Sequence, residues 1–273
     1  MSDLTRRAHA KLTLSLHVTG VRADGYHLID ADMVSLELHD LLTFSDAGSP
    51  TDTAGNDAPR LTATGPFADG MPLDPSNLVA RALELGGRSA HVTIDKRIPH
   101  GGGLGGGSTD AATALRWSGF GTSPGDLARA AALGADIPFC LVGGRARVQG
   151  IGEIIEPLPH EHRPIVLIIP PLQVSTPAVY RAWDQLDPTT RTGQRNDLEA
   201  AAIVVEPSLA QWRDDIEASI GVTPTLAGSG ATWFVEGELG SRSDAGLDAL
   251  SARGATIVRT QTVDAVRATG PGA

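Results

Sequence analysis

Apolar and polar residues alternate in two long stretches near the start of the chain, a pattern typical of β-strands with one buried face. The first stretch covers residues 8–18 and the second covers residues 33–45, with a turn indicated by Asp24–Gly25 between them. Further strands are predicted at 91–99, 164–170 and 254–263, and residues 224–237 read as two strands joined by a tight glycine turn. The run at 164–170 is almost wholly apolar, so we expect that strand to be buried.

Helices are predicted between these strands, where apolar residues recur at helical spacing. Ser76 is predicted to cap the first helix and Gly86 to end it, and Ser123 is predicted to cap a later one. The helical segments are 76–87, 108–117, 123–134, 175–186, 196–205, 207–219 and 243–253.

A change of composition near residues 157–164 separates the two halves of the chain. Strands and helices are mixed in both halves without a regular alternation, and no internal repeat is visible, so the pattern predicts an α+β protein. A length of 273 residues suits two modest domains. We place them at residues 1–158 and 159–273.

The composition argues against nucleic acid and membranes as partners of this protein. The chain is 41% hydrophobic and 20% charged with a formal net charge of −10, so nucleic acid is not an expected partner, because nucleic-acid binding depends on basic surface. The single cysteine, Cys140, excludes an internal disulfide and favours a reducing compartment. The N-terminal residues show no signal-peptide pattern, and no apolar run is long enough to span a bilayer. We therefore expect a cytoplasmic protein with no membrane partner.

Lysine is scarce in this chain. Only Lys11 and Lys96 are lysine among the 22 basic residues, which leaves 20 arginines. A compact ammonium fits confined sites that a planar guanidinium does not, so both lysines are candidates for special roles, with chance as the alternative.

Six glycines occupy the seven positions from Gly101 to Gly107, between a predicted strand and a predicted helix. Such a junction directs backbone N–H groups and the positive end of the helix toward one point, which suits a phosphate. A Walker loop requires a lysine that is absent here, and a dinucleotide fingerprint requires a preceding βαβ start that this sequence does not predict. The remaining pattern is P-x-x-x-G-L-G-x-x-S, here Pro99, Gly103, Leu104, Gly105 and Ser108.

The stretch "PHGGGLGGGST" resembles the second signature of the GHMP kinases. "AKLTLSLHVTGVRADGYH", "LGADIPF" and "LAGSGATWF" resemble signatures of the branch that phosphorylates 4-diphosphocytidyl-2-C-methyl-D-erythritol, a step toward isoprenoid precursors. "SNLVARAL", "STPAVY" and "NDLEAAA" also fit, and the motifs follow the order of the family along nearly the whole chain. The resemblance implies a ribosomal-protein-S5-domain-2-like N-terminal half and a ferredoxin-like C-terminal half.

The resemblance also implies roles for individual residues. Asp136 would act as general base on the attacking hydroxyl, with Lys11 paired to it, whereas from the bare sequence Asp136 reads as a helix or turn cap. ATP would be the phosphoryl donor, and magnesium would accompany its phosphates with Ser108 as a ligand. The residues assigned to ATP are Lys96, Pro99, His100, Gly101, Gly102, Gly103, Leu104, Gly105, Gly106, Gly107, Ser108 and Thr109. For Lys96 the alternative is that it only caps the sheet.

The substrate site implied by the resemblance contains Tyr26 and Tyr180 stacked on cytosine and His27 bonded to the base. The alternative for both tyrosines is ordinary packing. Gly228 and Ser229 would form a turn against the substrate and the phosphate loop, for which a plain hairpin turn is the alternative. Thr13 stands where the family usually has asparagine, and the helix after the glycine loop is expected to end early, at Ser118–Gly119.

These observations predict an ATP-dependent kinase of small molecules, acting as a monomer or homodimer. Another GHMP kinase, of the homoserine or mevalonate type, would explain the glycine loop but not "GYH" or "NDLE". A non-catalytic nucleotide-binding relative is the alternative from a different class, and Thr13 and the short helix are its only support.

Overall fold

The computed structural model describes residues 3–46, 60–190, 195–240 and 243–265. Its two longest strands, β1 (Leu4–Val21) and β2 (His27–Asp46), form an antiparallel pair connected through the predicted Asp24–Gly25 turn. Leu12 and Leu14 of β1 enter a buried cluster with residues of β7 (Pro164–Ile169). Because side chains alternate across a strand, Lys11 and Thr13 project to the opposite face, where the cleft described below lies.

The strands form a single sheet in the order β3-β4-β2-β10-β7-β9-β8, with β1 and β5 also paired to β2. The remaining strands are β3 (Arg60–Thr64), β4 (Ala90–Asp95), β5 (Arg145–Gly150), β6 (Ile154–Leu158), β8 (Thr225–Leu226), β9 (Trp233–Glu236) and β10 (Thr256–Val263). Apart from the parallel β3–β4 pair, the neighbours run antiparallel.

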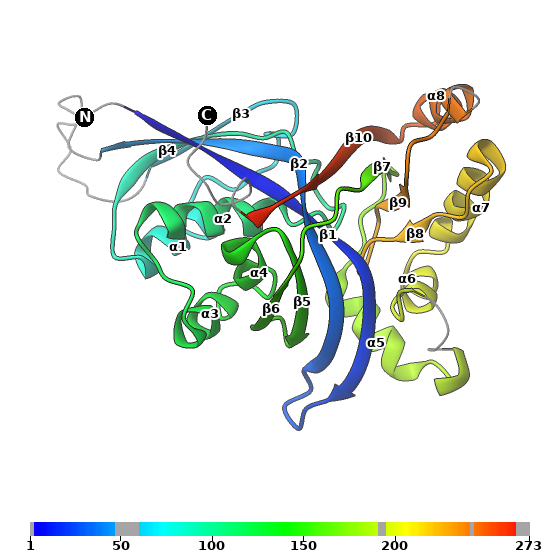
Figure 1. Cartoon of the computed structure of the whole chain (residues 1–273), viewed down its shortest axis with the longest axis horizontal. Helices are drawn as coiled ribbons and strands as arrows, with labels where there is room; N and C mark the ends of the chain where they lie inside the picture. Colours follow the sequence, from blue (N-terminus) through cyan, green and yellow to red (C-terminus); the bar gives the residue numbers. More distant parts are fainter. Residues whose placement is uncertain (1–2, 47–59, 191–194, 241–242, 266–273) are drawn as a thin grey trace.

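The helices fall into two groups (Figure 1). Those of the first half gather on one side of its strands, and those of the second half lie along the outer side of β7, β8 and β9. They are α1 (Leu78–Leu85), α2 (Gly106–Trp117), α3 (Pro124–Ala131), α4 (Ile137–Val142), α5 (Thr176–Gln185), α6 (Glu199–Val205), α7 (Ser208–Ile220) and α8 (Asp244–Ala252), with a 3₁₀ turn at Pro188–Thr190. None of the helices in the described ranges combines the length and apolar character needed to cross a membrane.

Of the four helix ends predicted from the sequence, the structure confirms three. Ser123 caps α3 through a capping box with Asp126, Gly86 is the C-cap of α1, and α2 ends early at Trp117 with Ser118 as its C-cap. The prediction of Ser76 as the cap of α1 is wrong. Asn77 is the N-cap, because its side-chain oxygen accepts a hydrogen bond from the Val79 N–H at 2.8 Å.

The two halves share the sheet through β10. Residues Thr256–Gln261 pair with β7 and belong to the second half, whereas Thr262 and Val263 pair with Leu36 and Ser35 of β2. The predicted division between residues 158 and 159 falls at the end of β6, and it stays a prediction, since a continuous sheet crosses it.

Candidate active site

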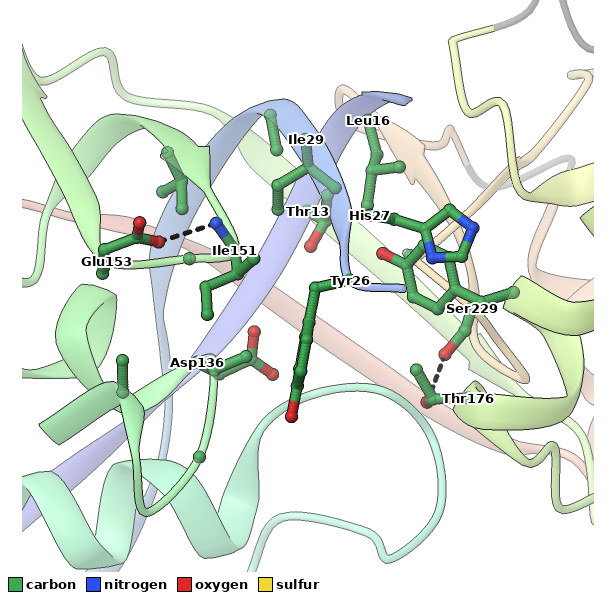
Figure 2. Close-up of a pocket in the computed structure, with 18 of the residues that line it drawn as sticks. Thr13, Leu16, Tyr26, His27, Ile29, Asp136, Ile151, Glu153, Thr176 and Ser229 are labelled. Carbon is green, nitrogen blue, oxygen red and sulfur yellow. Dashed lines mark hydrogen bonds between the residues drawn. The ribbon is translucent and has the colours of Figure 1, made fainter. Parts of the chain in front are cut away.

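A cleft of about 970 Å³ lies where the β1–β2 pair, the glycine loop, the segment before α4, α5 and the turn after β8 meet. It brings together ten residues predicted from the sequence: Lys11, Thr13, Tyr26, His27, Gly103, Ser108, Asp136, Tyr180, Gly228 and Ser229. Figure 2 shows Tyr26 extending between Asp136 on one side and the Thr176–Ser229 pair on the other. The cleft therefore joins parts of the chain that are more than 200 residues apart in the sequence.

Lys11 and Asp136 form an ion pair in this cleft, with 3.3 Å between Nζ and Oδ2. The Lys11 side chain is only 8% exposed and that of Asp136 is 39% exposed, so the carboxylate faces the open space. Asp136 occupies the N-cap position of α4, yet its side chain makes no capping hydrogen bond. The cap interpretation of Asp136 therefore does not account for its carboxylate, which is directed instead toward Lys11.

Lys11 is also tied to its neighbours. Its Nζ donates to Thr13 Oγ1 at 3.5 Å, and its backbone N–H donates to the Leu104 carbonyl at 3.0 Å. The second bond fixes β1 directly to the glycine loop. Thr13 thus retains a polar contact to the Lys11–Asp136 pair through a hydroxyl.

The glycine loop is packed closely against other parts of the protein. A Cβ on Gly105, where φ is 69°, would lie 2.6 Å from Lys11 Cγ, and one on Gly103, where φ is 73°, would lie 2.9 Å from the Gly230 carbonyl oxygen. Sequence reasoning explained these glycines by the approach of a phosphate. The structure adds a second cause, because β1 and the turn after β8 approach the same backbone.

The start of α2 suits an anion. Gly105 is its N-cap and offers no side chain, so the N–H groups of the first helical turn have no side-chain cap. Ser108, in this first turn, lines the cleft. A helix start with free N–H groups that opens on a cleft is a favourable place for phosphate.

Some residues predicted to bind ATP have side chains that are engaged inside the fold. The Leu104 side chain is buried in the core, and Pro99 is also buried. Thr109 is buried too, and its hydroxyl donates to the His9 carbonyl at 2.7 Å while its N–H donates to the Gly105 carbonyl at 2.8 Å. Both donors of Thr109 are therefore engaged within the protein.

Lys96 is likewise withdrawn from the cleft, contrary to its assignment to ATP. It is 2% exposed, and its Nζ lies 2.7 Å from Asp110 Oδ2 and also pairs with Asp40, which is itself fully buried. Asp40 in addition accepts from the Ile98 N–H at 2.8 Å. The ammonium thus links β2, the end of β4 and α2 behind the glycine loop. The structure favours the alternative in which Lys96 is structural.

Asp110 is the residue of this buried cluster whose carboxyl pKa is raised. Burial raises its pKa, the ammonium of Lys96 opposes that rise, and the nearby Asp40 adds to it. Its Oδ1 has no hydrogen-bond partner among the described residues. Burial is thus the main cause of the raised pKa, and the negative charge of Asp40 adds to it.

His27 is held in place by α5. Its Nε2 lies 2.7 Å from Asp184 Oδ1, and its ring packs 4.7 Å from the ring centre of Tyr180 and edge-on to Trp183 at 5.5 Å. Burial, followed by the charge of Asp136, raises the pKa of Tyr180 to about 12, so its hydroxyl remains protonated at neutral pH. Tyr26 is 59% exposed at the rim of the same cleft.

Asp184 and Trp183 were not identified from the sequence. Tyr180 and Asp184 are four residues apart on α5 and so share one face of the helix, which is the signal that could have paired Asp184 with the aromatic residues. The turn that carries Gly228 and Ser229 is fixed nearby, as the Ser229 hydroxyl lies 2.7 Å from that of Thr176 (Figure 2).

The comparisons with known proteins agree with this geometry. Residues 77–144, which include the glycine loop and Asp136, match the family model described as "GHMP kinases N terminal domain". The class that the fold and the cleft define is therefore that of the GHMP kinases, which use ATP as co-substrate.

Relatives define the family more narrowly. A 4-diphosphocytidyl-2-C-methyl-D-erythritol kinase of Paracoccus denitrificans is 41% identical over 83% of this chain and 84% of its own length. One of Dinoroseobacter shibae is 38% identical over 90% of both chains. A crystal structure of 4-(cytidine 5'-diphospho)-2C-methyl-D-erythritol kinase matches with a TM-score of 0.72 and 31% identity over 95% of this chain and all of the other. The chain belongs to the 4-diphosphocytidyl-2-C-methyl-D-erythritol kinase family.

Proposed function

We propose that this protein transfers the γ-phosphoryl group of ATP to the 2-hydroxyl of 4-diphosphocytidyl-2-C-methyl-D-erythritol. The observation that carries the proposal is the Lys11–Asp136 pair, which faces a cleft bounded by the glycine loop on one side and by Tyr26 and His27 on another. A phosphate cradle, an ionised pair and an aromatic recess in one cleft are the parts that a kinase of a nucleotide ester requires.

In the proposed reaction the substrate 2-hydroxyl attacks the γ-phosphorus. A new P–O bond forms, the bond between the γ-phosphorus and the β–γ bridging oxygen breaks, and ADP leaves. Asp136 accepts the proton of the hydroxyl, since its carboxylate is the exposed partner of the pair. Lys11 pairs with that carboxylate and lies close enough to stabilise the developing alkoxide, while Thr13 orients the ammonium.

The glycine loop and the start of α2 would hold the triphosphate through backbone N–H groups, with Gly103 and Ser108 on the cleft wall. His100, Gly101 and Gly102 belong to the same loop, and Gly106 and Gly107 form the first turn of α2, so their backbone would also approach the triphosphate. Within the described ranges no group of three acidic, histidine or cysteine side chains could hold a metal. A magnesium ion that arrives with ATP would take Ser108, which lines the cleft, as a protein ligand and would neutralise charge on the phosphates.

Tyr26, Tyr180 and His27 would bind the cytosine. The exposed ring of Tyr26 is free to stack on a base, and the His27–Tyr180 contact offers a second flat surface. Gly228 and Ser229 close the wall nearest Thr13 and would contact the erythritol part of the substrate.

Both predicted halves, 1–158 and 159–273, supply residues to the cleft, so one chain is sufficient for the site. This supports a monomer or a homodimer as the working unit, with small molecules as its partners. The single cysteine is buried and suits the cytoplasm.

The test is turnover of ATP by wild type and Asp136→Asn with the cytidyl substrate, homoserine and mevalonate. We expect turnover with the cytidyl substrate alone. We also expect Asp136→Asn to lower kcat by about 10² to 10⁴ with a modest change in KM. Asp248→Asn, on the exposed surface of α8, makes the same change of charge far from the cleft and should behave as wild type. Turnover with another acceptor would replace the substrate assignment, and ATP binding without turnover of any acceptor would favour a non-catalytic relative.

A further inference from the structure

The segment just before α6 is attached to β1 as a short parallel strand. Leu16 pairs with Asn196 in an isolated β-bridge, in which the Leu16 N–H donates to the Arg195 carbonyl and the Asp197 N–H donates to the Leu16 carbonyl, both at 2.9 Å. The Asp197 carboxylate adds bonds to the Val18 N–H at 3.0 Å and to His17 Nδ1 at 3.2 Å. This attachment lies on the same strand as Lys11 and Thr13.

The side chain of Asn196 points away from β1 and joins it to the turn after β8. Its Nδ2 donates to the Gly228 carbonyl at 2.6 Å and to the Leu226 carbonyl at 2.9 Å, and its Oδ1 accepts from the Leu198 N–H at 3.0 Å. The residue is 2% exposed, so all three bonds are shielded from water. Both amide hydrogens and one acceptor site are used, which leaves the group a single orientation.

The turn that Asn196 holds touches both sides of the cleft. Gly228 and Ser229 line the cleft, and a Cβ on Gly228 would lie 3.8 Å from Thr13 Oγ1. The Gly230 carbonyl lies against Gly103 of the glycine loop, where only a glycine leaves room for it. A shift of this turn would therefore change the distance between the acceptor wall and the phosphate loop.

We propose that Asn196 is a positioning residue for phosphoryl transfer: by bonding the carbonyls of Leu226 and Gly228 while its backbone pairs with β1, it sets the spacing between the Gly228–Ser229 turn, the glycine loop and Lys11. The inference rests on the proposed function of the cleft. It concerns alignment of the two reactants, for which an error of about 1 Å can cost about 10²-fold in rate.

A purely local role for Asn196 would be to start α6 through its bond to the Leu198 N–H. Asn196→Asp separates the two roles. The aspartate side chain has the same shape and keeps the oxygen that accepts from the Leu198 N–H, but a carboxylate oxygen replaces the amide NH₂ group and cannot donate to the carbonyls of Leu226 and Gly228. Asn196→Ser is the second variant, since a hydroxyl can still accept locally and can donate to only one of the two carbonyls.

The experiment measures kcat and KM for both substrates and the affinity for ADP, each corrected for the folded fraction. We expect both variants to lower kcat by about tenfold or more and to bind ADP within about twofold of wild type. Leu247→Ala removes a buried side chain of α8 and should lower stability without changing kcat per folded molecule. That control identifies any effect that comes from stability alone.

The result that overturns the inference is a folded Asn196→Asp or Asn196→Ser protein with kcat within about twofold of wild type. If neither variant folds, Asn196 is required for folding and its positioning role is withdrawn. A wild-type protein that does not turn over the cytidyl substrate contradicts the proposed function instead, so the two failures are distinct.

Discussion

Replacing Gly105 by alanine tests whether the glycine loop sets the position of Lys11, for which we propose a catalytic role. The added Cβ would lie 2.6 Å from Lys11 Cγ and 3.2 Å from its Cε, whereas carbon atoms in contact are normally about 3.5–4.0 Å apart. The backbone there is fixed as the N-cap of α2, and Lys11 is bonded through its N–H to Leu104. The Lys11 side chain must therefore move, by about 1 Å.

Two separate costs follow from this substitution. Alanine at a positive φ costs roughly 1–2 kcal/mol of stability, whatever its surroundings. Displacing the Lys11 ammonium by about 1 Å lengthens its 3.3 Å approach to Asp136, and errors of that size lower kcat by up to about 10²-fold. The first cost changes the free energy of unfolding and the second changes catalysis.

Gly119→Ala is the matched control. Gly119 follows the other end of α2 and has φ of 82°, but a Cβ there would meet no atom within 4 Å. Urea unfolding should show a similar loss of stability in both variants, and steady-state kinetics should show the fall in kcat in Gly105→Ala alone. The reasoning is refuted if Gly105→Ala is folded and its kcat stays within about twofold of that of Gly119→Ala.

Three further predictions concern the surroundings of the cleft. Lys11→Met should lower kcat as strongly as Asp136→Asn, and Lys11→Arg should not restore it, as steady-state kinetics will show, because the confined space holds an ammonium rather than a planar guanidinium. Tyr26→Ala should raise KM for the cytidyl substrate by about tenfold and leave KM for ATP unchanged, since stacking on a base contributes about 1–3 kcal/mol. The raised pKa of Asp110 means that its proton stabilises the folded chain at low pH, and that this stability is lost as the pH rises through the folded-state value. Asp110→Asn removes that loss, so urea unfolding should show the variant gaining stability relative to wild type from about pH 4 to about pH 7 and no further gain above that.

Each of these predictions has a result that contradicts it. Full activity of Lys11→Arg would show that the site accepts any cation. If Tyr26→Ala raises KM for ATP and leaves KM for the cytidyl substrate unchanged, then the two nucleotide sites have been assigned the wrong way round. A stability difference between Asp110→Asn and wild type that does not change with pH would mean that the pKa of Asp110 is the same in the folded and the unfolded chain. Asp248→Asn controls for the change in net charge.

The sequence predicts the elements with a strong local pattern. Alternation located the buried centre of β1 and β2, but the strands run from Leu4 to Val21 and from His27 to Asp46. The outer residues of β1 are exposed or half-buried, whereas residues 27–32 of β2 are half-buried or buried and were missed, although residues 29–32 alternate. The parallel strand β3 (Arg60–Thr64) alternates too, but over only 5 residues, which is too short a run to stand out in the sequence. The predicted strand at 91–99 ends at Asp95, where Lys96 turns into the buried cluster.

Residues whose roles depend on distant partners were harder to predict. Nothing near Gly103 in the sequence indicates that the Gly230 carbonyl packs on it, and nothing near Asn196 indicates its bond to Gly228. Resemblance to a family predicted that Lys11 and Asp136 are paired, and the structure places them 3.3 Å apart. It could not separate residues that face the cleft from those, such as Thr109, whose polar groups are used inside the fold.

The scarcity of lysine is explained by where the two lysines lie. Lys11 packs on Gly105 from the cleft side, and Lys96 Nζ lies behind Gly106, where a Cβ would be 3.3 Å away. The start of the phosphate-binding helix is thus held between two buried ammonium groups, one paired with Asp136 and the other with Asp40 and Asp110. A Cβ on Gly105 would lie only 2.6 Å from Lys11 Cγ, so the space beside the loop suits a compact ammonium on a flexible stem. The two lysines therefore hold the start of α2 from both sides, at the point where we propose that the loop receives phosphate.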